Sequence, residues 1–255
     1  MSIRILISND DSVNSDGLMK LRDVLTTLGE VLIVAPDRDQ SAVSHSLSLN
    51  RPLRIAELSP GIYGVDGTPT DCINLAVNGL YRDKKIDVVV SGINHGENLG
   101  EDITYSGTVS AAMEGTLLGI PSIAVSISAK TGFHYETACH YALRLTKKVL
   151  KLSLPEGVLL NVNIPNLALK DVKGLRVTRQ GKRIYGEKIV EKTDPRGKKY
   201  YWIGGNELGY VDIPDSDIIA VREGYVSVTP IKLDLTYYAY LDKLRADLET
   251  LKTDV

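Results

Sequence analysis

The chain contains few cysteines, and this scarcity excludes a disulfide-stapled scaffold. Only two occur among 255 residues, too few for a small domain that depends on disulfides for its stability. Cys72 and Cys139 each lie in an apolar pattern of helical spacing, with no Cys-x-x-Cys and no histidine at zinc-ligand spacing. We therefore expect both to be buried thiols.

The sequence also has no excess of charge of either sign. It carries 30 lysines and arginines against 32 aspartates and glutamates, for a formal net charge of −2. Such a chain lacks the basic footprint with which proteins bind a DNA or RNA duplex or an anionic lipid surface. We therefore expect neither nucleic acid nor membrane as a partner.

Long apolar runs are missing as well. No stretch approaches the ~18 apolar residues needed to cross a membrane. The apolar run at residues 3–7 turns polar at Ser8, too early for a signal peptide, and no cleavage site follows it. The sequence therefore predicts a cytoplasmic protein.

Three widespread enzyme motifs do not occur. The chain has no Gly-x-x-x-x-Gly-Lys-Ser/Thr loop, no Gly-x-Gly-x-x-Gly after its first apolar run and no Gly-x-Ser-x-Gly elbow. P-loop nucleotide hydrolysis is therefore excluded, and nothing favours a dinucleotide cofactor or a serine hydrolase.

What the sequence does contain is a series of apolar runs of strand length separated by amphipathic helical stretches. The runs are continuous, which is typical of parallel strands covered on both faces, and they occupy residues 3–7, 31–35, 86–90, 123–125 and 159–164. One apolar helical face extends from Leu18 to Leu28, and another from Ala138 to Val149. The pattern predicts an α/β fold with a Rossmann-like, doubly wound, mostly parallel sheet.

The last third of the chain reads differently. Residues 174–209 show β-type alternation around the turn-like segment 193–197, which predicts a long hairpin. Residues 224–230 predict another strand, and leucines from Leu235 to Leu251 at helical spacing predict a C-terminal helix.

A hairpin of this length has little core of its own, so we expect it to pack on another subunit. Its large aromatic residues Tyr200, Tyr201 and Trp202 favour burial at such an interface. We accordingly assign residues 1–170 to a catalytic core, and residues 171–255 to oligomerisation within the same domain.

Polar side chains gather where the predicted parallel strands end, which is where open sheets bind ligands. Asp10 and Asp11 follow the first run, Ser41 follows the second, and Asn94 follows the valine run at residues 88–90. Two adjacent carboxylates at a turn can face one point, but they repel each other unless a cation lies between them. Oxygen ligands of this kind suit Mg²⁺ or Mn²⁺ better than zinc or copper.

Asp10 and Asp11 could instead form a solvated acidic turn or cap the following helix. The two aspartates by themselves do not decide between this interpretation and a metal site. Ser41 and Asn94, at two other strand ends, favour the metal site.

A second candidate site begins at Ser106. Ser106 or Thr108 can cap the helix that follows, and Gly107 allows close backbone approach, so the exposed N–H groups would bind an anion such as phosphate. An ordinary N-cap is the alternative. His45 and His95 lie in predicted loops nearby and could donate to phosphate. A metal site and an anion site at one sheet edge indicate phosphoryl chemistry.

Two other functions compete with a phosphatase. A Mg²⁺-binding receiver module would need an Asp and a Lys at the ends of later strands, where this chain has Ser91 and Ser126. A nucleotide-sugar transferase also uses paired carboxylates on Mn²⁺, but it normally needs a second, acceptor-binding domain.

In their order along the chain, these motifs resemble those of the SurE family of stationary-phase survival proteins, which are metal-dependent nucleoside monophosphate phosphatases. The resemblance covers nearly the whole chain. The matching segments are Asn9-Asp10-Asp11, APDRDQS ending at Ser41, GTPTDC, SGINHGENLG, SGTVSAAMEG, NVNIP and REGYVSVTP.

The resemblance implies hydrolysis of nucleoside 5′- and 3′-monophosphates, with short polyphosphate as a further candidate substrate. It implies one divalent cation per subunit, Mg²⁺ or Mn²⁺, and a homodimer or homotetramer in which the C-terminal hairpin and helix are exchanged. Asp10 or Asp11 would act as general base, with an aspartyl-phosphate intermediate as the alternative. The implied metal ligands are Asp10, Asp11, Ser41 and Asn94, and the implied phosphate-site residues are Asn9, Asn98, Ser106, Gly107 and Thr108.

The chain departs from the family pattern at two positions. Ser12 stands where the first motif usually has glycine, so the loop after the aspartates is expected to differ in shape. Lys232 stands where many members have a histidine implicated in catalysis. If that histidine donates a proton, Lys232 must replace it, or the leaving group must take its proton from water.

Overall fold

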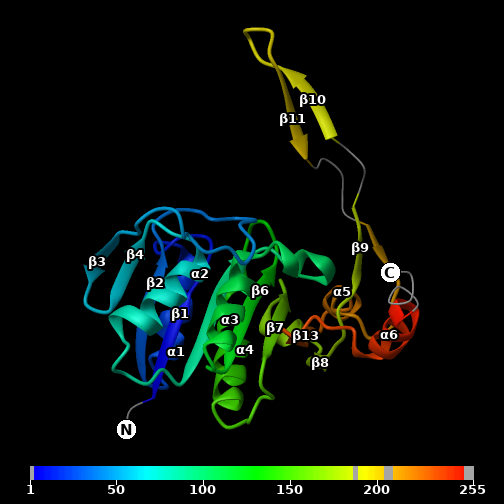
Figure 1. Ribbon diagram of the computed structural model, residues 1–255. Helices are drawn as coiled ribbons and strands as arrows, with labels where there is room; N and C mark the ends of the chain where they lie inside the picture. Colours follow the sequence, from blue (N-terminus) through cyan, green and yellow to red (C-terminus); the bar gives the residue numbers. More distant parts are fainter. Residues whose placement is uncertain (1–2, 186–188, 204–208, 250–255) are drawn as a thin grey trace.

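The computed structural model describes residues 3–185, 189–203 and 209–249, and a large twisted sheet runs through its centre (Figure 1). Its strands are β1 (Arg4–Ser8), β2 (Glu30–Pro36), β3 (Ile55–Ser59), β4 (Ile62–Val65), β5 (Val88–His95), β6 (Ser122–Ser128), β7 (Val158–Pro165), β8 (Leu175–Val177) and β13 (Val226–Lys232). Within the described residues this sheet has nine strands in the order β3-β4-β2-β1-β5-β6-β7-β13-β8. The β3/β4 and β7/β13 pairs are antiparallel and the other pairs are parallel.

Helices cover both faces of the sheet. The α-helices are α1 (Asp16–Leu25), α2 (Pro69–Leu75), α3 (Gly107–Leu117), α4 (Tyr135–Val149), α5 (Asp217–Arg222) and α6 (Leu241–Glu249), with shorter turns η1 (Ala76–Leu80), η2 (Gly100–Thr104), η3 (Leu169–Asp171) and η4 (Tyr238–Tyr240). Along β1, Ile5 and Ile7 join the core cluster that contains α1 and α4, whereas Leu6 joins the cluster that contains α2 and part of α3. Successive strand residues point to opposite faces, so both faces must be apolar. The predicted doubly wound, mostly parallel α/β sheet is confirmed.

The C-terminal third differs from the single long hairpin that the sequence predicts. β8 leaves the hairpin and pairs in parallel with β13 of the main sheet. The remaining ribbon forms two antiparallel pairs, β9 (Lys182–Ile184) with β12 (Gly209–Val211) and β10 (Ile189–Thr193) with β11 (Lys199–Ile203). The prediction was wrong for β8 because β-type alternation identifies a strand without identifying its partner, and here the open edge of β13 supplies one.

The turn at residues 193–197 is confirmed. Asp194 Oδ1 accepts the N–H groups of Arg196 and Lys198, each at 2.8 Å, and Gly197 has φ +79°. An aspartate that binds the backbone two residues ahead, followed by a glycine with positive φ, is a common way to reverse a β-ribbon.

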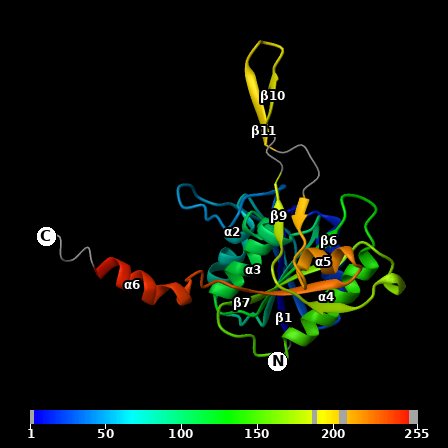
Figure 2. The ribbon, with the colours of Figure 1, turned by 90° about the vertical axis from the view of Figure 1, so that its right-hand side faces the viewer.

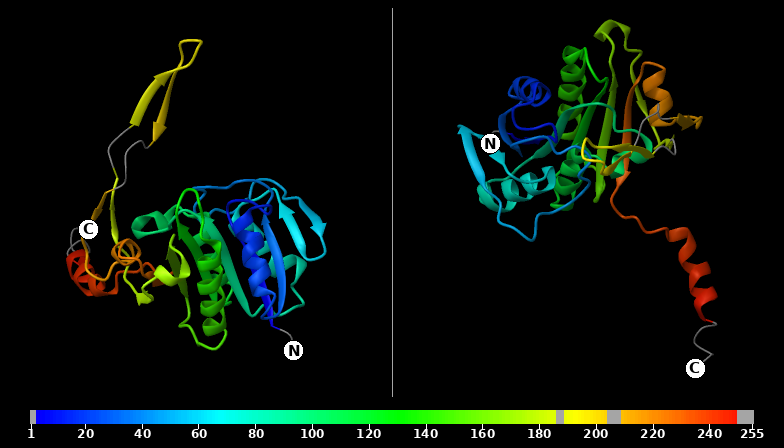
Figure 3. Two further views of the ribbon diagram at one scale, coloured as in Figure 1. Left: turned by 180° about the vertical axis from the view of Figure 1, so that it is seen from behind. Right: turned by 90° about the horizontal axis from the view of Figure 1, so that it is seen from above.

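Two segments extend away from the body of the molecule. The β10–β11 ribbon projects beyond the sheet, and α6 lies to one side of it (Figures 2 and 3). Trp202 is 62% exposed and Ile203 93% exposed on the ribbon, and Leu244 and Leu248 are exposed on α6. Exchange of these segments between subunits stays a prediction, and Leu251 lies outside the described residues.

Three smaller expectations can be compared with the structure. The C-terminal helix begins at Leu241 rather than near Leu235, because Asp234 Oδ1 accepts the N–H of Thr236 and holds that stretch in a turn. Cys72 is buried as expected, but Cys139 is only half-buried on α4, and both thiols are free. Within the described residues no helix combines the length and the apolar character of a membrane span.

Candidate active site

A cavity of about 220 Å³ lies where β1 and β5 end, and segments far apart in the sequence form its walls. The chain passes from β1 outward to β2 and later returns to the other side of β1 as β5, so the strand order reverses at this point. Open α/β sheets bind ligands at such a reversal. The residues lining the cavity are Asp10, Asp11, Ser41, Ala42, Asn94, His95, Asn98, Asp102, Tyr105 and Ser106.

The structure therefore brings together the residues that the sequence predicts as metal ligands. Two of the predicted phosphate-site residues, Asn98 and Ser106, also line the cavity, whereas Asn9, Gly107 and Thr108 lie beside it. Their side-chain contacts explain these positions.

Asp10 is the most deeply placed carboxylate of the site, at 5% exposure. Burial raises its pKa to about 6, although a hydrogen bond from the Thr108 hydroxyl acts in the opposite direction, and the neighbouring Asp11 adds a smaller upward effect. An ionised carboxylate in this place is costly unless a positive charge faces it. The site therefore suits a bound cation.

Asp11 is half-buried and faces β5. Its Oδ2 accepts the backbone N–H of His95 at 3.3 Å and lies 3.7 Å from His95 Nδ1. Burial raises the pKa of this carboxyl group as well, against the favourable charge of His95. Both carboxylates are thus oriented by neighbours on other elements.

Ser41 is carried by an irregular loop that is tied to the other walls of the cavity. Gln40 N donates to Asp10 O at 2.8 Å, Ser44 N donates to Tyr105 O at 3.1 Å, and Ser41 N donates to Asp39 Oδ1 at 2.9 Å. Backbone contacts on both sides of Ser41 therefore position it next to Asp10 and the start of α3.

Asn94 and His95 lie at the end of a strand rather than in a loop, so the predicted end of this strand was too early. β5 continues to His95, with a register shift against β6 between Ser91 and Asn94. Gly92 makes this path accessible, since its φ is +133° and a Cβ there would lie 2.3 Å from Val125 O. Asn94 Nδ2 donates to Gly96 O at 2.8 Å, which orients the amide.

The start of α3 approaches Asp10 closely. A Cβ on Gly107 would lie 2.7 Å from Asp10 Cβ and 3.0 Å from its Oδ2, so only glycine fits at this position. Ser106 Oγ accepts the N–H of Val109 at 3.1 Å and is the N-cap of the helix. Thr108 directs its hydroxyl to Asp10 rather than into the cavity.

Asn9 acts on the loop that follows Asp10 and Asp11. Its Nδ2 donates to Ser12 O at 2.9 Å and to Ser15 Oγ at 2.6 Å, while its Oδ1 is buried without a hydrogen-bond partner among the described residues. Ser12 has φ +103°, in the left-handed region that favours glycine. The loop thus keeps a backbone conformation that suits the family's glycine, although the residue here is serine.

Two asparagines on β7 hold Asn98 in place, and the sequence did not reveal this role. Asn161 Nδ2 and Asn163 Nδ2 donate to Asn98 O at 2.8 and 3.0 Å, and Asn98 N donates to Asn163 Oδ1 at 2.8 Å. Asn98 Nδ2 also donates to Ser126 Oγ at 2.8 Å. The available signal was a pair of amides at i and i+2 in an apolar strand, hence on one face of the sheet.

Two residues considered at the sequence level lie outside this cavity. His45 Nε2 contacts Glu114 Oε2 at 3.0 Å, and neither residue lines the cavity of Asp10. Lys232, like His45, lines a separate cavity of about 680 Å³, and its Nζ lies 3.9 Å from Asp234 Oδ2. Among the described residues, neither side chain lines the cavity that contains Asp10.

Comparisons of this chain with a family model, with individual sequences and with a solved structure all find the same family. Residues 5–187 match the sequence model of the family described as Survival protein SurE. The chain is 51% identical over 245 residues to the 5′-nucleotidase SurE of Geobacter sulfurreducens, covering 96% of this chain and 93% of the relative. It is 52% identical over 242 residues to the 5′-nucleotidase SurE of Myxococcus xanthus, covering 94% and 92%. A crystal structure of the SurE protein from Aquifex aeolicus superposes with a TM-score of 0.86 at 48% identity, covering 95% of this chain and 98% of that one.

Proposed function

The chain belongs to the SurE family of survival proteins, and on this premise we propose that it is a 5′-nucleotidase. Its reaction is the hydrolysis of nucleoside 5′-monophosphates to nucleoside and phosphate. The observation that carries the proposal is the single cavity in which Asp10, Asp11, Ser41 and Asn94 lie beside the capped start of α3. The likeness to 5′-nucleotidases supports this reaction over a receiver module or a nucleotide-sugar transferase.

The donor set fits one divalent cation of the Mg²⁺ or Mn²⁺ type. Asp10, Asp11, Ser41 and Asn94 would hold it, through carboxylate, hydroxyl and amide oxygens, which hard cations prefer. Throughout residues 3–185, 189–203 and 209–249, no group of three or more His, Cys, Asp or Glu side chains offers a competing metal site. When bound, the cation supplies Lewis acidity toward a phosphoryl oxygen and toward water.

The chain's own residues supply the remaining steps. Asn98, Ser106 and the N-terminal end of α3 hold the phosphate and stabilise charge on its oxygens. Asp10 or Asp11 accepts a proton from the attacking water, with attack on the phosphorus by one of these carboxylates as the alternative. Lys232 lies apart from Asp10 in the same chain, which favours water as the proton donor to the leaving group.

Finer features of the function are part of the same proposal. Nucleoside 3′-monophosphates and short polyphosphate are further candidate substrates. The exposed aromatic and aliphatic side chains of the β10–β11 ribbon and of α6 support a homodimer, or a homotetramer of two dimers, formed through residues 171–255. The division into a core of residues 1–170 and this second segment rests on the sequence, although β8 and β13 belong to the main sheet. A cytoplasmic location likewise rests on the sequence alone.

A metal and substrate panel tests the proposal. Metal-stripped protein is combined with Mg²⁺, Mn²⁺ or Zn²⁺ and with nucleoside 5′- and 3′-monophosphates, p-nitrophenyl phosphate and tripolyphosphate, and phosphate release is measured. We expect release from 5′-monophosphates with Mg²⁺ or Mn²⁺, and none with Asp11→Asn. Release by the metal-stripped parent at the rate of the metal-loaded parent would contradict the metal requirement, and release by metal-loaded Asp11→Asn at that rate would contradict the site.

A further inference from the structure

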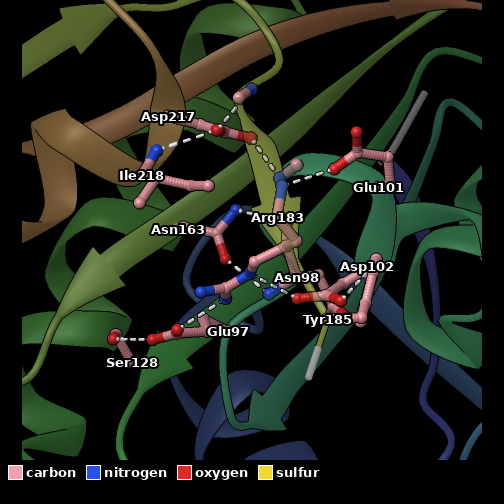
Figure 4. A network of polar contacts seen from close by, with 12 residues as sticks. Glu97, Asn98, Glu101, Asp102, Ser128, Asn163, Arg183, Tyr185, Asp217 and Ile218 are labelled. Carbon is pink, nitrogen blue, oxygen red and sulfur yellow. Dashed lines mark hydrogen bonds and ion pairs between the residues drawn. The ribbon is translucent and has the colours of Figure 1, made fainter. Parts of the chain in front are cut away.

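Arg183 connects the base of the C-terminal ribbon to the wall of the candidate active site (Figure 4). It lies on β9, is 8% exposed, and contacts two carboxylates at once. Its Nη2 lies 2.7 Å from Glu97 Oε1, and its Nε lies 2.8 Å from Asp102 Oδ2. Buried arginines are normally paired in this way, because an unpaired buried charge is costly.

The two carboxylates flank the residue that is proposed to contact phosphate. Glu97 and Asp102 lie on either side of Asn98 in the sequence, and Asp102 lines the cavity together with Asp10 and Asp11. Both oxygens of Asp102 are engaged by the β9 segment, since Tyr185 Oη donates to Asp102 Oδ1 at 2.8 Å. Glu97 also accepts a hydrogen bond from Ser128 Oγ.

The pKa values agree with charged partners on both sides. Burial alone would lower the pKa of Arg183, but its contacts with Glu97 and Asp102 outweigh that effect and raise it. Burial alone would raise the pKa of Glu97, and the hydrogen bonds from Arg183 and Ser128 lower it instead.

A second contact keeps the β9 segment against the same loop. Asp217 on α5 is 1% exposed, accepts Gly100 N at 2.9 Å through Oδ2, and accepts Gly181 N at 2.8 Å through Oδ1. A Cβ on Gly181 would lie 2.7 Å from Asp217 Oδ1, so the approach is tight. Arg183 is thus held in register with residues 97–102 by neighbours outside its own ion pairs.

The charges around the cavity indicate why the ion pair between Arg183 and Asp102 matters for substrate binding. Three carboxylates line the cavity, from Asp10, Asp11 and Asp102, and among the described lining residues there is no lysine or arginine and the only basic group is His95. A phosphate monoester arrives as a dianion, which such a wall repels. A divalent cation would balance the charges of Asp10 and Asp11, whereas the charge of Asp102 is balanced by Arg183.

We propose that Arg183 is a positioning residue of the phosphate site, which neutralises Asp102 and holds the Asn98 loop so that a phosphate dianion can bind. The inference rests on the proposed phosphatase function and extends it to the C-terminal segment. Arg183 does not line the cavity, so its effect passes through Asp102 and Glu97.

The test compares Arg183→Met with the double variant Arg183→Met/Asp102→Asn. In the single variant, the Asp102 charge is left unbalanced at the cavity wall. We expect KM for a nucleoside 5′-monophosphate to rise on the order of tenfold, as one extra charge acts on a dianion through partly hydrated protein. The Kd of inorganic phosphate, measured by calorimetry in the presence of Mn²⁺, should rise in parallel. The double variant should lower both constants again relative to Arg183→Met, because the charge at the cavity wall is gone, whereas Glu97, which also loses Arg183, does not line the cavity.

Arg176→Met is the matched control. Arg176 lies on β8 in the same C-terminal segment, and its Nη1 lies 2.5 Å from Glu223 Oε2. Neither of these residues lines the cavity. Arg176→Met should keep the parental KM and phosphate Kd. Melting temperatures of all variants show whether each is folded.

If Arg183→Met does not fold, Asp102→Asn alone provides the measurement. With Arg183 intact and one carboxylate fewer, KM and the phosphate Kd should stay at the parental values or fall. A rise in both constants for Asp102→Asn would overturn the proposal, as would an unchanged KM in a folded Arg183→Met or a failure of the double variant to recover. A parental protein without phosphatase activity would instead contradict the proposed function, and the phosphate Kd values would still test the role of Arg183.

Discussion

The buried carboxyl group of Asp10 allows a prediction about stability that does not depend on catalysis. The pKa of Asp10 is raised from 3.8 to about 6, chiefly by burial. The folded metal-free protein therefore binds this proton more tightly than the unfolded chain does. By linkage, the free energy of unfolding decreases as pH rises from about 4 to about 6, and above that range the full cost is present.

The size of the effect follows from the shift in pKa. A difference of about 2 units corresponds to roughly 3 kcal/mol at neutral pH, taken as an order of magnitude. Asp10→Asn removes the charge, keeps the side-chain volume and leaves an oxygen that can accept the Thr108 hydroxyl. In the absence of metal at pH 7, we therefore expect this variant to be more stable than the parent, with a melting temperature higher by several degrees, since 1 kcal/mol corresponds to about 2–4 °C in a chain of this size.

The assay is thermal unfolding of metal-stripped protein from pH 4 to pH 8, read as the difference between the variant and the parent so that other titrating groups cancel. The difference should be small near pH 4 and grow to its full value above pH 6. Asp87→Asn is the control, and it should be less stable than the parent at neutral pH. The Arg4 backbone N–H donates to Asp87 at 2.9 Å and lowers the pKa of that carboxyl group, so its charged form stabilises the fold. A difference for Asp10→Asn that does not change with pH would refute the reasoning.

Three further predictions follow from the site and the ribbon. Ser106→Ala should lower turnover by on the order of 10²-fold, because a donor to the phosphate is lost. The control is Ser110→Ala, which should keep the parental rate, since the Ser110 hydroxyl donates to Ser106 O at 2.6 Å. If steady-state assays give the parental rate for both variants, Ser106 serves only as a helix cap. Ser12→Gly should raise the free energy of unfolding in urea by about 1 kcal/mol, because φ +103° is easier for glycine, and an unchanged or lower value would mean that Ser12 is not strained. Light scattering of the full chain at micromolar concentration should give at least twice the subunit mass of 27.9 kDa, and a stable, active monomer would refute subunit exchange.

The sequence predicted which residues meet at one end of the sheet, because parallel sheets impose a strong rule. Once the apolar runs are recognised as parallel strands, their carboxyl ends must share one edge, and Asp10, Ser41 and Asn94 follow three such runs. The structure brings these residues to one cavity. The rule concerns where the backbone of each strand ends at the sheet edge. It therefore still brought Asn94 to the cavity, although the predicted strand ended at residue 90 and β5 continues to His95.

The same rule says little about which side chains touch one another. Thr108 was expected at the phosphate, yet its hydroxyl donates to Asp10, and Asn9 was expected in the pocket, yet it holds the loop at Ser12 and Ser15. These outcomes depend on rotamers and on distances of a few ångströms. Spacing along the sequence does not determine them.

Arg183 shows why the remaining part of the site was beyond sequence reasoning. It is 86 residues from Glu97 and 81 from Asp102, in a segment whose alternation predicts only a ribbon. Whether an arginine in such a ribbon meets solvent or a carboxylate depends on where the ribbon crosses the body of the protein. At that crossing, Asp217 accepts hydrogen bonds from both Gly100 N and Gly181 N, a contact between distant segments that the sequence does not reveal. The contact buries the Arg183 guanidinium between two carboxylates at the edge of the candidate site. If Arg183 acts as proposed, the segment expected to serve oligomerisation also sets the charge that a phosphate substrate meets, and a change in one role should be measurable in the other.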